Sequence, residues 1–176
     1  VVSSFFTIGN YDYGIFWYLY LDGTIEFEVK LTGMLYLRAI SEGEETPYGS
    51  LVAPGVSGMV HEHYFNVRLD MSVDGDANTV VEMQADRIPT GPNNPHGNAH
   101  GVSQTVITSE QEGARDTAPK DSRFWKIENR GCSNRLGWHP AYKLMPGPNV
   151  APMHQPESPF MRRAGFVAHD LWVTAY

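Results

Sequence analysis

The chain has 176 residues, with 13 Lys and Arg against 20 Asp and Glu, and so carries a formal net charge of −7. Because the basic residues are scattered singly, the sequence excludes the basic surface of a nucleic-acid-binding protein. The single cysteine, Cys132, excludes an internal disulfide framework and a zinc site built from thiolates. No apolar run reaches the length of a membrane span, so no membrane partner is predicted.

Apolar and polar residues alternate along most of the chain, which predicts an all-β sandwich. In "TIEFEVKL" the apolar residues share one face of a half-buried strand. The pair Asp22-Gly23 ahead of it suits a type I′ turn and predicts a β-hairpin over residues 15–31. Further strands are predicted over 33–40, 59–70, 79–85, 102–109, 123–128 and 164–175, and a surface loop over about 110–122.

The predicted strand "MVHEHYFNVRLDM" is the most informative segment. Its alternation places His61 and His63 on the face that otherwise carries apolar residues. Same-face neighbours on a strand stand roughly 7 Å apart at Cα, so two imidazoles can converge on one ion. Imidazole without thiolate suits copper, zinc, iron or nickel, and the residues alone do not choose among them. Spacing nominates none of the other histidines, which are His96, His100, His139, His154 and His169.

Four segments, in order, resemble motifs of the copper amine oxidases. These are "TIGNYDY", "HEHYFNVRLDMSVDG", "NRLGWHPAYKLMPGPN" and "RRAGFVAHDLWVTAY". The first is similar to the family's Thr-x-x-Asn-Tyr-Asp/Glu signature and the second to its His-x-His copper segment. The resemblance implies that residues 1–176, with no internal boundary, are an internal part of the large antiparallel β-sandwich (supersandwich) catalytic domain.

The resemblance also implies the chemistry. Tyr11 would be the precursor of topaquinone, formed by Cu(II) and O₂ and able to form a Schiff base with a primary amine. The products would be an aldehyde, ammonia and hydrogen peroxide. Gly9, Asn10 and Asp12 would orient the ring or leave room for substrate, although ordinary turn chemistry also explains them. His61 and His63 would bind the copper, and Tyr13 is interpreted as structural.

Other expected parts of the family's site lie outside these residues. The resemblance places the catalytic aspartate before Val1 and the third copper histidine beyond Tyr176, so His169 is not assigned as a ligand. The isolated piece is therefore predicted to be inactive. A peripheral Ca²⁺ site at Asp70 is doubtful, because Ser72 replaces a carboxylate that hard cations prefer. A homodimer follows only from the resemblance.

Two other functions fit parts of the sequence. A cupin-like metal dioxygenase also uses His-x-His, but no Glu follows His63 at the required short distance. A non-catalytic β-sandwich binding module would make both histidines structural and leave Tyr11 unmodified. The absence of Asn-x-Ser/Thr sites favours an intracellular compartment, cytoplasmic or peroxisomal.

Overall fold

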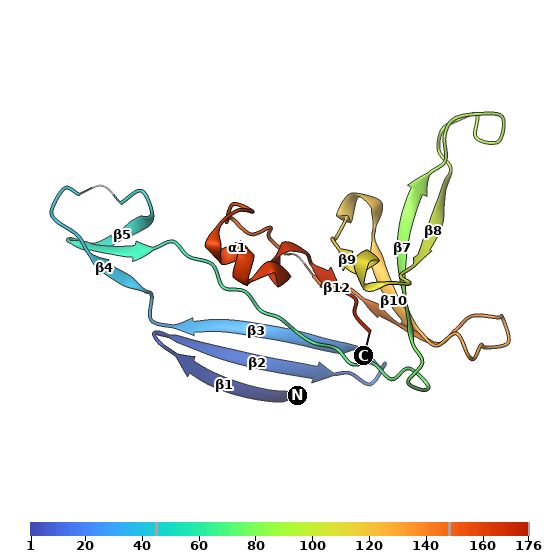
Figure 1. Cartoon of the computed structure of the whole chain (residues 1–176), viewed down its shortest axis with the longest axis horizontal. Coiled ribbons are helices and arrows are strands. Elements are labelled where there is room, and N and C mark those ends of the chain that lie inside the picture. The colour runs from blue at the N-terminus through green and yellow to red at the C-terminus, as the bar shows by residue number, and fades with distance from the viewer. Residues whose placement is uncertain (45, 148, 176) are drawn as a thin grey trace. The chain divides into compact units, whose positions relative to one another are not determined.

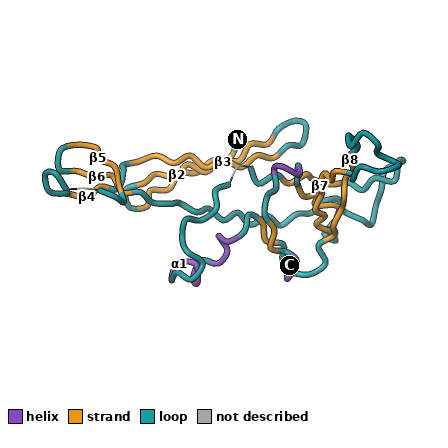
Figure 2. The backbone as a smooth tube through the Cα atoms, turned by 90° about the horizontal axis from the view of Figure 1, so that it is seen from above, coloured by secondary structure: helices purple, strands orange, loops and turns teal. Residues whose placement is uncertain are grey.

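The computed structural model describes residues 1–44, 46–147 and 149–175. Contacts divide the chain into two compact units, Val1–His63 and Tyr64–Tyr176. Strands and loops make up nearly all of it, and the helices are few and short (Figure 2). The prediction of an all-β fold is confirmed, whereas the prediction that the chain has no internal domain boundary stays a prediction.

The first unit begins with a three-stranded antiparallel sheet in the order β1 (Val2–Ile8), β2 (Tyr11–Leu19) and β3 (Ile25–Gly33) (Figure 1). Strand β1 was not predicted, because "VVSSFFTI" pairs like residues and so lacks alternation. Gly9 and Asn10 form the β1–β2 turn, with a positive φ of 61° at Gly9 and none at Asn10. A positive φ at the first central residue is typical of a type II′ turn.

The hairpin predicted over 15–31 is present, but the prediction of a type I′ turn is wrong. Gly23 has a φ of 86°, whereas Asp22 does not adopt a positive φ. The Gly23 N–H donates to the Tyr20 carbonyl at 3.1 Å, and the Tyr20 N–H donates to the Thr24 carbonyl at 3.0 Å. This three-residue loop with one left-handed glycine is the next commonest hairpin connection. The Asp22 carboxylate accepts the Thr24 N–H at 2.9 Å, which favours this geometry.

The two faces of the β2–β3 hairpin differ as the alternation predicts. On one face Trp17 packs against Phe27, with ring centroids 4.7 Å apart. On the other face the Tyr18 hydroxyl donates to Glu28 at 2.7 Å. Tyr18 and Trp17 therefore point to opposite sides of β2, as adjacent residues of a strand must.

A second sheet in the first unit has the order β4 (Leu37–Ala39), β6 (Val56–Met59) and β5 (Gly49–Ala53). The strand predicted over 59–70 is wrong, because β6 ends at Met59 and no strand follows before β7. Alternation shows which way side chains face, but a strand also needs a hydrogen-bonded partner. No described strand pairs with residues 61–70, and Phe65 on the supposed core face is 43% exposed.

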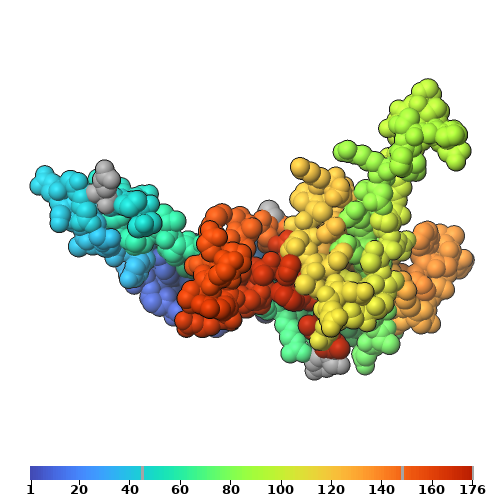
Figure 3. Space-filling model, turned by 45° about the horizontal axis from the view of Figure 1, so that its top comes forward, coloured from blue at the N-terminus to red at the C-terminus, as the bar shows by residue number. Residues whose placement is uncertain are grey.

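The second unit is built on a four-stranded antiparallel sheet. Its order is β11 (Ala141–Leu144), β10 (Phe124–Glu128), β7 (Thr79–Arg87) and β8 (His100–Val106). Three predicted strands, over 79–85, 102–109 and 123–128, are confirmed with small shifts of their ends. The far end of the β7–β8 hairpin projects from the rest of the second unit (Figure 3). Asn94 closes that end by donating to the Ile88 carbonyl at 2.7 Å.

The strand predicted over 164–175 is wrong apart from β12 (Leu171–Trp172), which pairs with β9 (Ala114–Arg115). Helix α1 (Pro159–Arg163) precedes it, capped by the Ser158 hydroxyl, which accepts the Met161 N–H at 3.1 Å. Short 3₁₀ helices occupy Glu110–Glu112, Pro119–Asp121 and Gly165–Ala168. No described helix is long and apolar enough to cross a bilayer.

A buried ion-pair cluster holds the core of the second unit. Trp125 is fully buried, and its indole N–H donates to Glu82 at 3.1 Å. Arg115 makes two hydrogen bonds to the same carboxylate, and Arg123 lies 3.4 Å from it. Burial raises the pKa of Glu82, but the hydrogen bonds and charges of Arg115 and Arg123 outweigh it and lower the pKa below its ordinary 4.5.

This cluster predicts an acid-sensitive core. Because the folded pKa of Glu82 is lowered, its stabilisation is complete above the unfolded value of 4.5 and is lost as the pH falls through the lower folded value. Glu82→Gln should destabilise the full-length protein at neutral pH. It should also flatten the acid limb of the pH profile, which is the fall in the urea-unfolding midpoint as the pH is lowered. Glu42→Gln, at an exposed position, is the matched control. An unchanged acid limb in Glu82→Gln would contradict the assignment.

Candidate functional site

The hydroxyl of Tyr11 lies in a chain of hydrogen bonds that runs through His61. Its oxygen is 2.7 Å from His61 Nε2, and His61 Nδ1 is 2.8 Å from the Met59 carbonyl oxygen. A carbonyl only accepts, so Nδ1 carries the proton and Nε2 presents its lone pair. Tyr11 therefore donates to Nε2, and its oxygen accepts the Tyr36 N–H at 3.0 Å.

A second tyrosine–histidine pair, Tyr13 and His63, lies beside Tyr11 and His61. The Tyr13 hydroxyl is 3.0 Å from His63 Nδ1. The His61 and His63 ring centroids are 4.8 Å apart, and the Tyr11 ring meets His63 edge-on at 4.9 Å. Burial, and then the electrostatic effect of His61, lower the pKa of His63 and so favour the neutral ring that a metal ion requires. Two imidazoles and a phenol thus converge on one place in the first unit.

The donors at this place fit copper. Nδ1 of each imidazole has an outer protein partner, the Met59 carbonyl for His61 and the Tyr13 hydroxyl for His63. Nε2 lies on the other side of each ring, and in His61 it accepts the hydrogen bond of the Tyr11 hydroxyl. Imidazole nitrogen is a favoured ligand for Cu(II). In the part of the chain that the structure describes, no group of three His, Cys, Asp or Glu could hold a metal ion. The described residues therefore offer two histidine ligands, with the Tyr11 hydroxyl next to them.

The flanking residues hold the backbone of the site. The Thr7 hydroxyl donates to the Asp12 carboxylate, across the register pair Thr7 and Asp12. The Asn10 carbonyl accepts the Met34 N–H at 2.7 Å. Gly9 supplies the positive φ of the turn. In the described contacts Gly9, Asn10 and Asp12 fix where β2 begins, and so where Tyr11 stands.

Gly33 permits the close approach on the other side of Tyr11. It is the β3 residue that pairs with Tyr11, and its φ is 104°. A Cβ built on it would lie 2.5 Å from the Asn10 carbonyl oxygen, 2.7 Å from the Asp12 nitrogen and 2.8 Å from the Tyr11 Cα. All three are backbone atoms, which cannot swing aside as the end of a flexible side chain can. A side chain at position 33 would displace the start of β2.

The remaining candidate residues, Asp70 and His169, lie in the second unit. Asp70 is exposed, in a segment without strand structure, and Ser72 donates to Asp76 at 3.0 Å. His169 contacts Asp116 at 3.0 Å.

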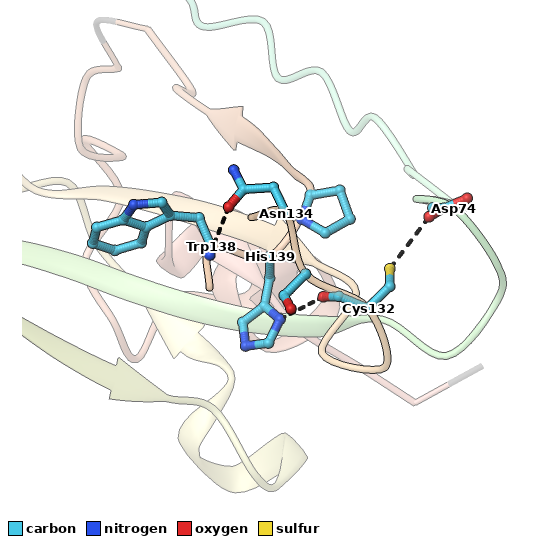
Figure 4. A pocket seen from close by; sticks show the side chains of 7 residues that line it. Asp74, Cys132, Asn134, Trp138 and His139 are labelled. Atoms are coloured by element: carbon cyan, nitrogen blue, oxygen red, sulfur yellow. Dashed lines mark hydrogen bonds between the residues drawn. The ribbon is translucent and has the colours of Figure 1, made fainter. Parts of the chain in front are cut away.

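A cavity of about 320 Å³ in the second unit is lined by residues that include Cys132 and His139 (Figure 4). A hydrogen bond to Asp74 at 3.2 Å raises the pKa of the Cys132 thiol and so disfavours a reactive thiolate.

Fold and site together define a β-sheet protein in which a tyrosine hydroxyl lies against two neighbouring imidazoles. The family model described as "Copper amine oxidase, enzyme domain" matches residues 1–176. The chain is 46% identical over its full length to histamine oxidase of Arthrobacter globiformis, and 44% identical over 99% of its length to a peroxisomal copper-containing diamine oxidase of Nicotiana tabacum. The chain belongs to the copper amine oxidase family.

The solved structures agree. A copper-containing benzylamine oxidase from Hansenula polymorpha matches with a TM-score of 0.91 and 29% identity over 99% of this chain and 28% of that one. The chain spans 26% of the histamine oxidase and 23% of the diamine oxidase. It is thus about a quarter of the length of these relatives. Membership of the copper amine oxidase family sets aside the cupin-like dioxygenase.

Sequence reasoning identified Tyr11, His61 and His63 but missed three neighbours. Tyr13 was interpreted as structural, yet its hydroxyl contacts His63. The Tyr36 N–H and Gly33 were not considered. A signal for Tyr13 was present, because Tyr11 and Tyr13 repeat the two-residue spacing of His61 and His63. The backbone contacts of Tyr36 and Gly33 have no sequence signal, because they depend on how β3 and its continuation pass Tyr11.

Proposed function

We propose that the full-length protein oxidises primary amines, with Cu(II) and a topaquinone formed from Tyr11. Amine, O₂ and water are converted to aldehyde, ammonia and hydrogen peroxide, so the amine loses two electrons and O₂ gains them. The observation that carries the proposal is the Tyr11 hydroxyl 2.7 Å from His61 Nε2, beside His63. The names of the relatives, which include histamine, diamine and benzylamine oxidases, support an amine substrate.

His61 and His63 would hold the copper through Nε2, and a third histidine and the catalytic aspartate are proposed to come from other parts of the protein. Bound copper supplies the charge that favours a phenolate, and the quinone supplies an electrophilic carbonyl and an electron sink. His61 Nε2 cannot both ligate a metal and accept the Tyr11 proton. Once Nε2 is a ligand, the hydroxyl loses its acceptor, and the Tyr36 N–H remains as a donor that stabilises negative charge on the Tyr11 oxygen.

Gly9, Asn10 and Asp12 are proposed to orient the ring through the backbone that they hold in place. A peripheral Ca²⁺ at Asp70 gains no support from its exposed surroundings. A homodimer and an intracellular compartment stay proposals, and the word peroxisomal in the names of tobacco and Pichia angusta relatives supports the second. The isolated piece is proposed to be inactive, because it would lack the aspartate and the third ligand.

The experiment is cofactor formation in the full-length protein. The protein is prepared without copper, then exposed to Cu²⁺ and air, treated with phenylhydrazine and digested for mass spectrometry. We expect a coloured adduct on the peptide that contains Tyr11 and none in Tyr11→Phe. Copper binding with an unmodified Tyr11 would overturn the proposal.

A further inference from the structure

We propose that Tyr13 is a positioning residue for the copper ligand His63. Its hydroxyl oxygen accepts a hydrogen bond from Nδ1–H and so leaves Nε2 free for the metal. The inference rests on the proposed function and adds a residue to its site. The Tyr13 and Tyr11 ring centroids are 6.4 Å apart, but the role proposed for Tyr13 uses its hydroxyl. It acts through His63, by fixing which ring nitrogen carries the proton and how the ring is turned.

The backbone explains why Tyr13 is in place. Side chains of a strand alternate, so Tyr11 and Tyr13 leave β2 on the same face. Each meets the histidine fifty residues further on, Tyr11 at His61 and Tyr13 at His63. The Tyr13 and His63 ring centroids are 5.8 Å apart with the planes at 61°, so the hydroxyl reaches the ring edge where Nδ1 lies. Alternation along β2 thus places Tyr13, like Tyr11, on the face where it meets its histidine.

The chemistry of imidazole gives the contact its meaning. A neutral ring carries one proton, and the nitrogen that binds a metal must be the other one. His61 has this arrangement already, because its Nδ1 donates to the Met59 carbonyl at 2.8 Å. His63 has the Tyr13 oxygen at the same ring position, at 3.0 Å. Both rings therefore present the same atom, Nε2, to one ion.

The two outer partners differ in a way that makes the role testable. The partner of His61 is a backbone carbonyl, which no substitution removes. The partner of His63 is a side-chain hydroxyl, which Tyr13→Phe deletes while the ring and its packing remain. Tyr18→Phe is the matched control, because it deletes a hydroxyl from the opposite face of the same strand, where Tyr18 donates to Glu28.

The test uses the full-length apoprotein in a Tyr11→Phe background, so that no quinone forms during the measurement. Copper affinity is measured by competition with a chelator, and the Cu(II) site by electron paramagnetic resonance. Loss of an outer hydrogen-bond partner of a ligating histidine typically costs about 10- to 100-fold in metal affinity. We expect Tyr13→Phe to bind copper at least about 10-fold more weakly, with altered nitrogen hyperfine structure, and Tyr18→Phe to match the background protein.

Two results would overturn the inference, and they are distinguishable. If Tyr13→Phe binds copper with unchanged affinity and an unchanged spectrum, Tyr13 has no positioning role and the proposed function stands. If the background protein itself binds no copper, the proposed function fails and this inference fails with it. A purely structural role for Tyr13 would lower thermal stability but leave the spectrum of the bound copper unchanged.

Discussion

His61→Ala in the full-length protein is expected to abolish both copper binding and cofactor formation. His61 Nε2 is one of two histidine donors next to Tyr11, and the same ring accepts the Tyr11 proton. Deleting it removes a ligand and the acceptor together. An outer partner of such a histidine is worth about 10- to 100-fold in affinity, so loss of the ligand itself must exceed that range. Amine oxidation should fall to the level of the Tyr11→Phe variant.

The measurement is metal content after dialysis, followed by phenylhydrazine titration of the quinone. His96→Ala is the control, because His96 is exposed at the end of the β7–β8 hairpin. That variant should retain copper and quinone. Full copper occupancy and full quinone yield in His61→Ala would rule out His61 as a ligand and would require a different metal site.

Gly33→Ala is the second substitution expected to have a large effect. The new Cβ would lie 2.5 Å from the Asn10 carbonyl oxygen and 2.8 Å from the Tyr11 Cα, at a φ of 104°. The left-handed backbone alone costs a side chain about 1–2 kcal/mol. The backbone clash adds to this, so we expect a loss of about 3 kcal/mol or more. Because Tyr11 moves with the start of β2, quinone formation should slow as well.

Gly43→Ala separates the two causes. Gly43 also has a positive φ, of 75°, but a Cβ there meets nothing within 4 Å. Urea unfolding of the full-length variants should show a modest loss for Gly43→Ala, with a normal rate of quinone formation. Gly33→Ala should show both a larger loss of stability and slower formation. Equal effects of the two substitutions would mean that the close approach to Tyr11 has no consequence.

The alternation of apolar and polar residues predicted strands well where a strand is paired with another strand on each side. Residues 79–85 and 123–128 were found because β7 and β10 lie inside a sheet, where pairing and pattern agree. Residues 59–70 carry an equally clear pattern, but no described strand pairs with residues 60–70. Hydropathy records the direction of side chains, whereas a strand depends on a partner that can be far away in the sequence. The two-residue strands β9 and β12 are too short for any pattern.

The candidate site also contains residues that the sequence predicts and contacts that it does not predict. His61 and His63 were predicted from their residue type and two-residue spacing, and Tyr11 from the resemblance of its segment to a motif of the copper amine oxidases. The contacts of Gly33 and of the Tyr36 N–H are made by backbone, and sequence does not show which backbone atoms pass a given side chain. Tyr13 lies between these cases. Its hydroxyl is visible in the sequence, but its role depends on the register that brings it to His63 rather than to solvent.

The Gly9-Asn10 turn couples the proposed cofactor formation to the register of β2. It sets the pairing of β1 with β2, and a shift of one residue in β2 would turn Tyr11 and Tyr13 to the opposite face together. Both imidazoles would then lose their tyrosine partners at once. A tyrosine that is converted only beside copper would stay unconverted in such a misaligned molecule. The yield of quinone would therefore report the fraction of molecules that folded with this strand in the native register.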